Sequence, residues 1–140
     1  DIVDMSMPAA GVFHNCLIVS IRKRYPKHAQ KVMSAIWGAH LLSLSKLIVV
    51  VDDDCDVQDH QEVAFRAFSN VDYSHDLVLT EGPVDHLDHS SYQQFWGGKA
   101  GVDATRKLPT EGYLRGWPEP TVMSPEVVSL VDRRWKEYGL

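Results

Sequence analysis

The sequence has 140 residues, a length at which one domain can bury a hydrophobic core. Its hydrophobic fraction of 44%, charged fraction of 24% and net charge of −5 are typical of a soluble globular protein and argue against a nucleic-acid-binding one. No apolar run reaches the roughly 18 residues that a membrane span requires. The two cysteines, Cys16 and Cys55, have no CxxC partner, which predicts reduced thiols in a cytoplasmic protein. Because the chain begins at Asp1 without Met, we expect it to be a piece of a longer polypeptide.

The first third of the chain predicts an irregular lead-in, a strand and a helix. Residues 1–11 show no periodicity, whereas His14–Ile21 is rich in β-branched residues and is predicted to be a strand. A basic turn, Arg22–Lys27, follows. From His28 onward, apolar residues recur at three- and four-residue steps and predict an amphipathic helix, with Ala29, Val32, Met33, Ile36, Trp37 and Leu41 on its buried face.

The segment Lys46–Asp56 predicts the central strand. Five consecutive apolar residues, Leu47–Val51, run into the aspartates Asp52, Asp53 and Asp54. An unbroken apolar run is typical of a strand covered on both faces, as in a parallel sheet. Since ligands of open α/β sheets gather at the carboxyl ends of strands, the acidic end is the first place to search for a site.

The next elements are a capped helix and a third strand. Asp59 can cap a helix and Glu62, three residues on, can be its reciprocal partner; the helix is predicted to bury Val63, Ala64, Ala67 and Phe68. Leu77–Thr80 is predicted to be the third strand. The irregular region 84–120 follows, with a short strand expected at Ala100–Thr105.

The chain closes with Ser124 as a helix N-cap and Pro125 at the first helical position. This last helix is predicted to carry its apolar face on Val128, Val131, Trp135 and Tyr138. The order β-α-β-α-β, irregular loop region, C-terminal helix predicts a single α/β layered domain over residues 1–140 with a mainly parallel sheet.

Three clusters could carry chemistry. The spacing of Asp52, Asp54 and Asp56 invites a calcium loop, but Val57 and Val63 occupy the positions where such a loop needs Gly and Glu, so a structural role is favoured. The second cluster is Asp85-His86-Leu87-Asp88-His89, whose histidines lie three residues apart. They could share a metal or handle protons, although surface histidines would produce the same pattern.

The third cluster is Gly97-Gly98-Lys99-Ala100-Gly101. Paired glycines before a lysine can let the backbone approach an anion. The spacing of a nucleotide-binding loop is absent, so a structural turn is the favoured interpretation. Taken from the residues alone, the sequence predicts an α/β domain and no reaction.

Four motifs in order resemble the C-terminal region of UbiD-family decarboxylases: HNCLIVSIRKRYPKHAQKVMSAIWG, LIVVVDDDCDVQDHQEVAFRAFSNVDYSHDLVL, GGKAGVDATRK and WPEP. The resemblance covers residues 8–138. It implies a reversible, non-oxidative decarboxylase of aromatic or α,β-unsaturated carboxylic acids that uses prenylated FMN, with a divalent metal and potassium beside its phosphate. In this family the C-terminal domain is tied to oligomerisation, so a homo-oligomer, or a companion subunit, is the implied partner.

The resemblance also implies what this stretch lacks. The catalytic Glu-Arg-Glu constellation, the cofactor barrel and the metal ligands belong to a central domain, so no catalytic or metal residue is expected here and the stretch alone is expected to be inactive. Relatives place a basic residue ahead of the central strand near the cofactor phosphate, a position that His40 occupies. They also line the substrate cavity from the loop that here carries Asp85, His86, Leu87 and His89. The alternative is a non-catalytic module for oligomerisation or partner binding. The sequence does not identify the acid, the direction of the reaction or the oligomer size.

Overall fold

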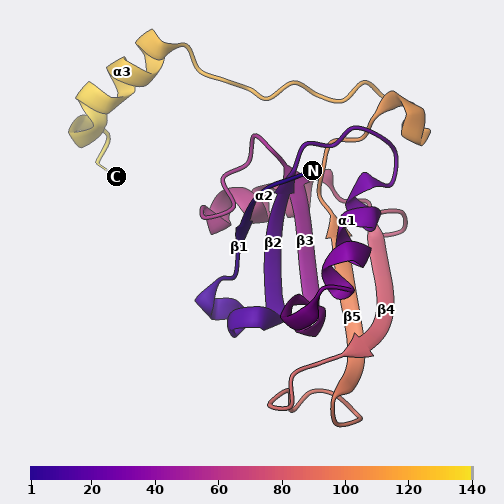
Figure 1. The fold of residues 1–140 in the computed structure, drawn as a ribbon. Coiled ribbons are helices and arrows are strands. Elements are labelled where there is room, and N and C mark those ends of the chain that lie inside the picture. The colour runs from indigo at the N-terminus through magenta and orange to yellow at the C-terminus, as the bar shows by residue number, and fades with distance from the viewer. Residues whose placement is uncertain (140) are drawn as a thin grey trace.

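A mixed five-stranded sheet forms the centre of the molecule (Figure 1). The computed structural model describes residues 1–139. The strands are β1 (Ile2–Ser6), β2 (Cys16–Ile21), β3 (Leu47–Asp52), β4 (Leu77–Pro83) and β5 (Trp96–Asp103), in the order β1-β2-β3-β5-β4. Strands β2, β3 and β5 are parallel, whereas β1 and β4 pair antiparallel at the two edges. The predicted α/β class with a mainly parallel sheet is confirmed.

Helices α1 (His28–Trp37) and α2 (His60–Asn70) bury their apolar sides against the two faces of this sheet. On the α1 face, Met33 and Ile36 pack with residues such as Val19 and Val50; on the α2 face, Val63 packs with Val51. Successive residues of β2 and β3 therefore pack alternately against α1 on one face of the sheet and α2 on the other. This explains why β3 needs an unbroken apolar run.

The start of α2 confirms part of the predicted cap. The Asp59 carboxylate accepts hydrogen bonds from the backbone N–H groups of Gln61 (2.9 Å) and Glu62 (3.2 Å). The Glu62 carboxylate, however, accepts from the N–H of Asp56 at 3.3 Å instead of returning to Asp59. Glu62 thus holds the loop before the helix.

Several strands differ from their predicted bounds. Strand β2 begins at Cys16 instead of His14, and β4 ends at Pro83 instead of Thr80. The predicted lead-in contains β1, which pairs antiparallel with β2 at the sheet edge and is exposed at four of its five residues, so it lacks the pattern of a buried strand. The predicted short strand at Ala100–Thr105 is Trp96–Asp103 instead, and it lies between β3 and β4. The third predicted strand is therefore an antiparallel edge strand.

The glycines of the Gly97–Gly101 motif lie inside β5, so the predicted turn is wrong. A Cβ at Gly101 would stand 2.4 Å from Sδ of Met33, and one at Gly97 would stand 2.5 Å from Oγ of Ser91. These two glycines allow α1 and a neighbouring loop to approach the strand closely.

Short 3₁₀ helices and a separate C-terminal segment complete the chain. The 3₁₀ helices are η1 (Ala9–Gly11), η2 (Phe13–Asn15), η3 (His40–Leu44), η4 (Pro109–Glu111) and η5 (Trp135–Tyr138). Helix α3 (Pro125–Arg134) has the predicted Ser124 cap and lies away from the sheet at the end of an extended arm (Figure 1). Among residues 1–139, no helix combines the length and apolarity of a membrane span.

Two residues that were predicted to be buried, Phe68 and Leu41, are exposed. Phe68 on α2 is 79% exposed, because α2 faces the sheet mainly through Val63. Leu41 is 67% exposed, because α1 ends at Trp37 and η3 starts a new direction. The apolar side of α3 and η5, including Trp135, is exposed to solvent.

Candidate functional site

The acidic end of β3 is bound in ion pairs. The backbone N–H of Arg106 donates to Asp52 at 2.8 Å, and Nε of Arg22 lies 2.9 Å from Asp53. Asp54 pairs with the guanidinium groups of Arg66 and Arg106. Burial raises the pKa of Asp52, opposed by the hydrogen bond and charge of Arg106. The structural interpretation of this aspartate run fits these contacts.

Behind the aspartates lies a set of buried ion pairs. The Lys23 ammonium is 3% exposed and lies 2.7 Å from Glu111, while Lys107 lies 3.1 Å from Asp76. The side chain of Asp103 turns back to the N–H and hydroxyl of Thr105. These pairs fix the segment after β5 to the carboxyl ends of the parallel strands.

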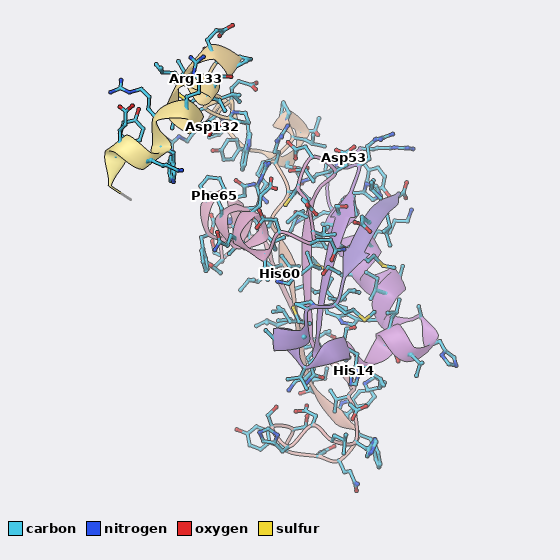
Figure 2. All side chains as sticks on the ribbon, turned by 90° about the vertical axis from the view of Figure 1, so that its left-hand side faces the viewer. His14, Asp53, His60, Phe65, Asp132 and Arg133 are labelled. Atoms are coloured by element: carbon cyan, nitrogen blue, oxygen red, sulfur yellow. The ribbon has the colours of Figure 1, made fainter. Side chains whose placement is uncertain are left out.

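The predicted site residues gather at the opposite end of the sheet. There η2, η3 and the loop between β4 and β5 lie together at the bottom of the molecule (Figure 1). His14 and Asp53 mark the two ends, far apart along the sheet (Figure 2). The structure thus separates the acidic end from the candidate site.

Among the four predicted substrate-side residues in the loop between β4 and β5, Asp85 makes the most contacts. It is half-buried; its carboxylate accepts from the N–H of Leu87 at 2.8 Å and lies 3.2 Å from Nε2 of His14. The side chain of His86 points to the same carboxylate at 3.6 Å and is 63% exposed. Leu87 and His89 are exposed. The four predicted residues thus offer a half-buried carboxylate, two exposed imidazoles and one exposed apolar side chain.

His40 lies at the start of η3 and has a left-handed backbone, with φ of 34°. Residues other than glycine rarely adopt such a φ unless the surroundings hold them there. The hydroxyl of Ser43 donates to the carbonyl of His40 and closes the turn. The His40 side chain is exposed, and among the described residues none forms an ion pair with it.

Two lysines and an aspartate beside these residues were not predicted. Asp88, whose carboxylate is 4% exposed, lies 2.8 Å from Nζ of Lys46. Lys99 is 4% exposed and donates to the carbonyls of Ser43 and Ser45. The room for the buried Lys99 side chain comes from Gly82 on the neighbouring strand β4, where a Cβ would stand 2.9 Å from Cε of Lys99, and this relation between strands leaves no local signal in the sequence.

The electrostatics of this end depend on burial. Burial and, to a smaller extent, the charge of Lys46 together lower the pKa of Lys99 to about 8. Hydrogen bonds from Lys46 and Ser91 hold the pKa of Asp88 well below its usual range. Among residues 1–139, no group of three His, Cys, Asp or Glu side chains is arranged to hold a metal ion.

The fold and this arrangement define an α/β domain that presents a loop and a turn at one end of its sheet, the end opposite the ion-paired aspartates. Residues 1–104 match the sequence model of the 3-octaprenyl-4-hydroxybenzoate carboxy-lyase C-terminal domain. The chain belongs to this family, that of the UbiD C-terminal domains.

Curated relatives are similar to this chain along nearly its whole length. A protein of Archaeoglobus fulgidus is 50% identical over 138 residues, covering 98% of this chain and 29% of its own length. A protein of Aquifex aeolicus is 48% identical over 140 residues, again 29% of its length. The chain therefore spans less than a third of the length of these curated relatives.

Solved structures have the same fold. The UbiD-class enzyme HmfF from Pelotomaculum thermopropionicum, solved in complex with FMN, is 23% identical with a TM-score of 0.78, over 94% of this chain and 28% of that one. The closed form of vanillic acid decarboxylase from Sedimentibacter hydroxybenzoicus is 22% identical with a TM-score of 0.80, over 98% and 28%. At these identities the similarity establishes the fold.

Proposed function

We propose that this chain is the C-terminal domain of a reversible, non-oxidative decarboxylase of aromatic or α,β-unsaturated carboxylic acids. Its role is to contribute a substrate-side loop and subunit contacts to an enzyme that uses prenylated FMN. The observation that supports the proposal is that the His40 turn and the 85–89 loop lie at the same end of the sheet in a UbiD C-terminal fold. In this proposal residues 1–140 form one domain of a cytoplasmic enzyme.

The substrate-side residues are Asp85, His86, Leu87 and His89. Leu87 can lie against an apolar ring, since it is 76% exposed, and the polar neighbours can bind ring hydroxyls or a carboxylate. Asp85 is already oriented by the N–H of Leu87 and by His14. This polar lining favours a phenolic or otherwise polar acid over a purely apolar one.

His40 is the proposed cofactor-side residue. Its exposed imidazole, held on a closed turn, fits an outer contact to a phosphate when it is protonated. One imidazole does not make a complete cofactor site, so the flavin, its divalent metal and its potassium would be held mainly by a central domain. The bound cofactor would supply the electron sink for loss of carbon dioxide.

The test is made on the decarboxylase polypeptide that contains this chain. We expect bound flavin absorbance and carbon dioxide release from an aromatic acid. His40→Ala should lower flavin retention, whereas His86→Ala should raise KM for the acid with flavin content unchanged. His60→Ala, an exposed histidine on α2, is the matched control. A purified protein without flavin or decarboxylation would contradict the proposal.

A second role concerns the chain on its own, as a module for oligomerisation or partner binding. The observation in its favour is the apolar side of α3 and η5, where Val128 is 46% exposed and Trp135 is 50% exposed. Sedimentation of the 140-residue chain should show a concentration-dependent oligomer, and Val128→Asp should shift it to monomer. A monomer at all concentrations would contradict this role.

A further inference from the structure

Lys99, on strand β5, holds the His40 turn (η3) through hydrogen bonds to its backbone carbonyls. Its side chain is buried, and its ammonium donates to two backbone carbonyls at the end of η3, that of Ser43 and, at 2.9 Å, that of Ser45. The Ser45 carbonyl also accepts from Nε1 of Trp37 at 3.0 Å. No carboxylate pairs with Lys99 among the described residues, so its buried charge is balanced only by backbone dipoles.

Lys46 holds the substrate-side loop in a similar manner, through contacts of its ammonium group with side chains of that loop. It stands directly before β3 and contacts the carboxylate of Asp88 (2.8 Å) and the hydroxyl of Ser90. The same carboxylate accepts from the N–H of Ser90 (3.1 Å) and from the hydroxyl of Ser91 (2.6 Å). Asp88 thus ties together the second half of the loop that carries residues 85–89.

Glycines leave the space that both contacts require. A Cβ on Gly82 of β4 would stand 2.9 Å from Cε of Lys99. One on Gly97 would stand 2.5 Å from the hydroxyl of Ser91. Gly98, by contrast, has no atom within 4 Å of its Cβ position. The close approaches therefore occur at the positions beside the two lysine contacts, and a neighbouring glycine in the same strand is free of them.

We infer that Lys99 and Lys46 are positioning residues, Lys99 for the His40 turn and Lys46 for the 85–91 loop. This inference rests on the proposed function for its catalytic meaning, but its structural content can be measured without it. A buried lysine that pairs only with carbonyls is costly, which is the kind of local exception found where geometry is needed for function.

The first experiment measures amide exchange by NMR in the 140-residue chain and in Lys99→Met and Lys46→Met. Lys99→Met should speed exchange of the Ser43 and Ser45 amides, and of the Trp37 indole N–H, by about tenfold or more, which corresponds to about 1.4 kcal/mol of local opening. The amides of Leu87 and Ser90 should keep their rates. Lys46→Met should instead speed exchange of the Leu87 and Ser90 amides and leave the rates of the Ser43 and Ser45 amides unchanged.

Local and general effects can be told apart. Gly82→Ala should disturb the Ser43 and Ser45 amides as Lys99→Met does, and Gly98→Ala should leave them unchanged. Unchanged exchange in Lys99→Met, or equal acceleration of both segments in both lysine variants, would overturn the inference. The second outcome would mean that the lysines support the whole domain instead of one segment each.

The pH dependence of amide protection is a further test, because a side chain at position 99 that does not titrate would not change it. Two charged groups, Lys46 ahead of β3 and Glu81 on β4, line the same groove of about 620 Å³ as Lys99, and Asp88 on the loop pairs with Lys46. Opening the turn hydrates Lys99 and returns its pKa from about 8 toward 10.5, so opening takes up a proton above pH 8. Protection of Ser45 should therefore rise with pH above 8 in the parent chain and stay level in Lys99→Met; equal slopes would contradict the inference.

The second experiment uses the complete flavin-loaded decarboxylase. Lys99→Met should lower flavin retention, as His40→Ala does, and Lys46→Met should raise KM for the acid with less change in kcat. If the parent enzyme binds no flavin, the proposed function fails while the exchange data still decide whether the lysines position the two segments. If the parent is active and both variants match it, the positioning role is wrong although the proposed function stands.

Discussion

Gly101 of β5 offers a sharp test of how closely α1 packs on the sheet. In Gly101→Ala the new Cβ would lie 2.4 Å from Sδ and 3.2 Å from Cγ of Met33. Ordinary contacts between such atoms need about 3.5–4.0 Å, so Met33 or the helix must move by about 1 Å. Met33 is fully buried, which leaves it little freedom to do so.

The expected cost follows from that overlap. Inserting a methyl group into a well-packed core costs about 1–3 kcal/mol. Replacing glycine by alanine also removes backbone freedom from the unfolded chain, which returns about 0.4–1 kcal/mol. The net range is about 0–2.6 kcal/mol, so Gly101→Ala should lower the free energy of unfolding by about 1.3 kcal/mol, the centre of that range. Gly98→Ala, with no atom within 4 Å, should leave it unchanged or raise it slightly.

Urea denaturation, followed by circular dichroism, measures both variants. The midpoint should fall for Gly101→Ala at an unchanged slope, and Gly98→Ala should match or exceed the parent. A double-mutant cycle with Met33→Ala should give a coupling energy of at least about 0.5 kcal/mol, because the two residues share the contact. A Gly101→Ala protein as stable as the parent, or equal losses in both alanine variants, would refute this reasoning.

Three further predictions concern other parts of the fold. Asp59→Ala removes the cap of α2 and should cost about 1 kcal/mol of unfolding free energy in urea, whereas Asp59→Asn should cost less. Glu111→Gln leaves the buried Lys23 with Asp103 alone, so thermal melts should show a loss below the roughly 3–5 kcal/mol of a fully broken buried pair. Although burial opposes it, Lys23 holds the pKa of Glu111 below its usual 4.5, so this contribution is complete above that pH and is lost in more acidic solution. Burial raises the pKa of the Cys55 thiol to about 11, so mass spectrometry should find it unalkylated at pH 8 until urea is added; alkylation of the native protein would contradict its burial.

The elements that bury apolar residues on one clear face could be predicted from the sequence. The run Leu47–Val51 and the three- and four-residue spacing after His28 each indicated one element, and the structure has both. Strand β1 and the edge position of β4 could not be found this way, because edge strands are only partly covered and tertiary pairing decides them. The glycines of β5 signalled a turn locally, but the close approach of Met33 required them inside a strand.

The candidate site could be located only in part. The family resemblance led to His40 and to the loop at Asp85, and the structure brings their two segments to one end of the sheet, where their roles remain predictions. Asp88 and Lys99 belong to clusters that the sequence singled out, but their contacts and those of Lys46 were missed, since they join residues more than 40 positions apart or depend on burial that no local pattern reveals. The aspartates at the strand end attracted notice through their spacing, but arginines distant in the sequence pair with them.

The position of β5 between β3 and β4 has a consequence for the order of folding. Strand β4 is synthesised before β5, but within residues 1–139 its only strand partner is β5, not β1, β2 or β3. Until residues 96–103 have emerged, β3 has one open edge and β4 has no strand partner. The nascent domain must therefore protect an apolar edge until β5 is available, and a chain stopped within the preceding loop would be prone to aggregation.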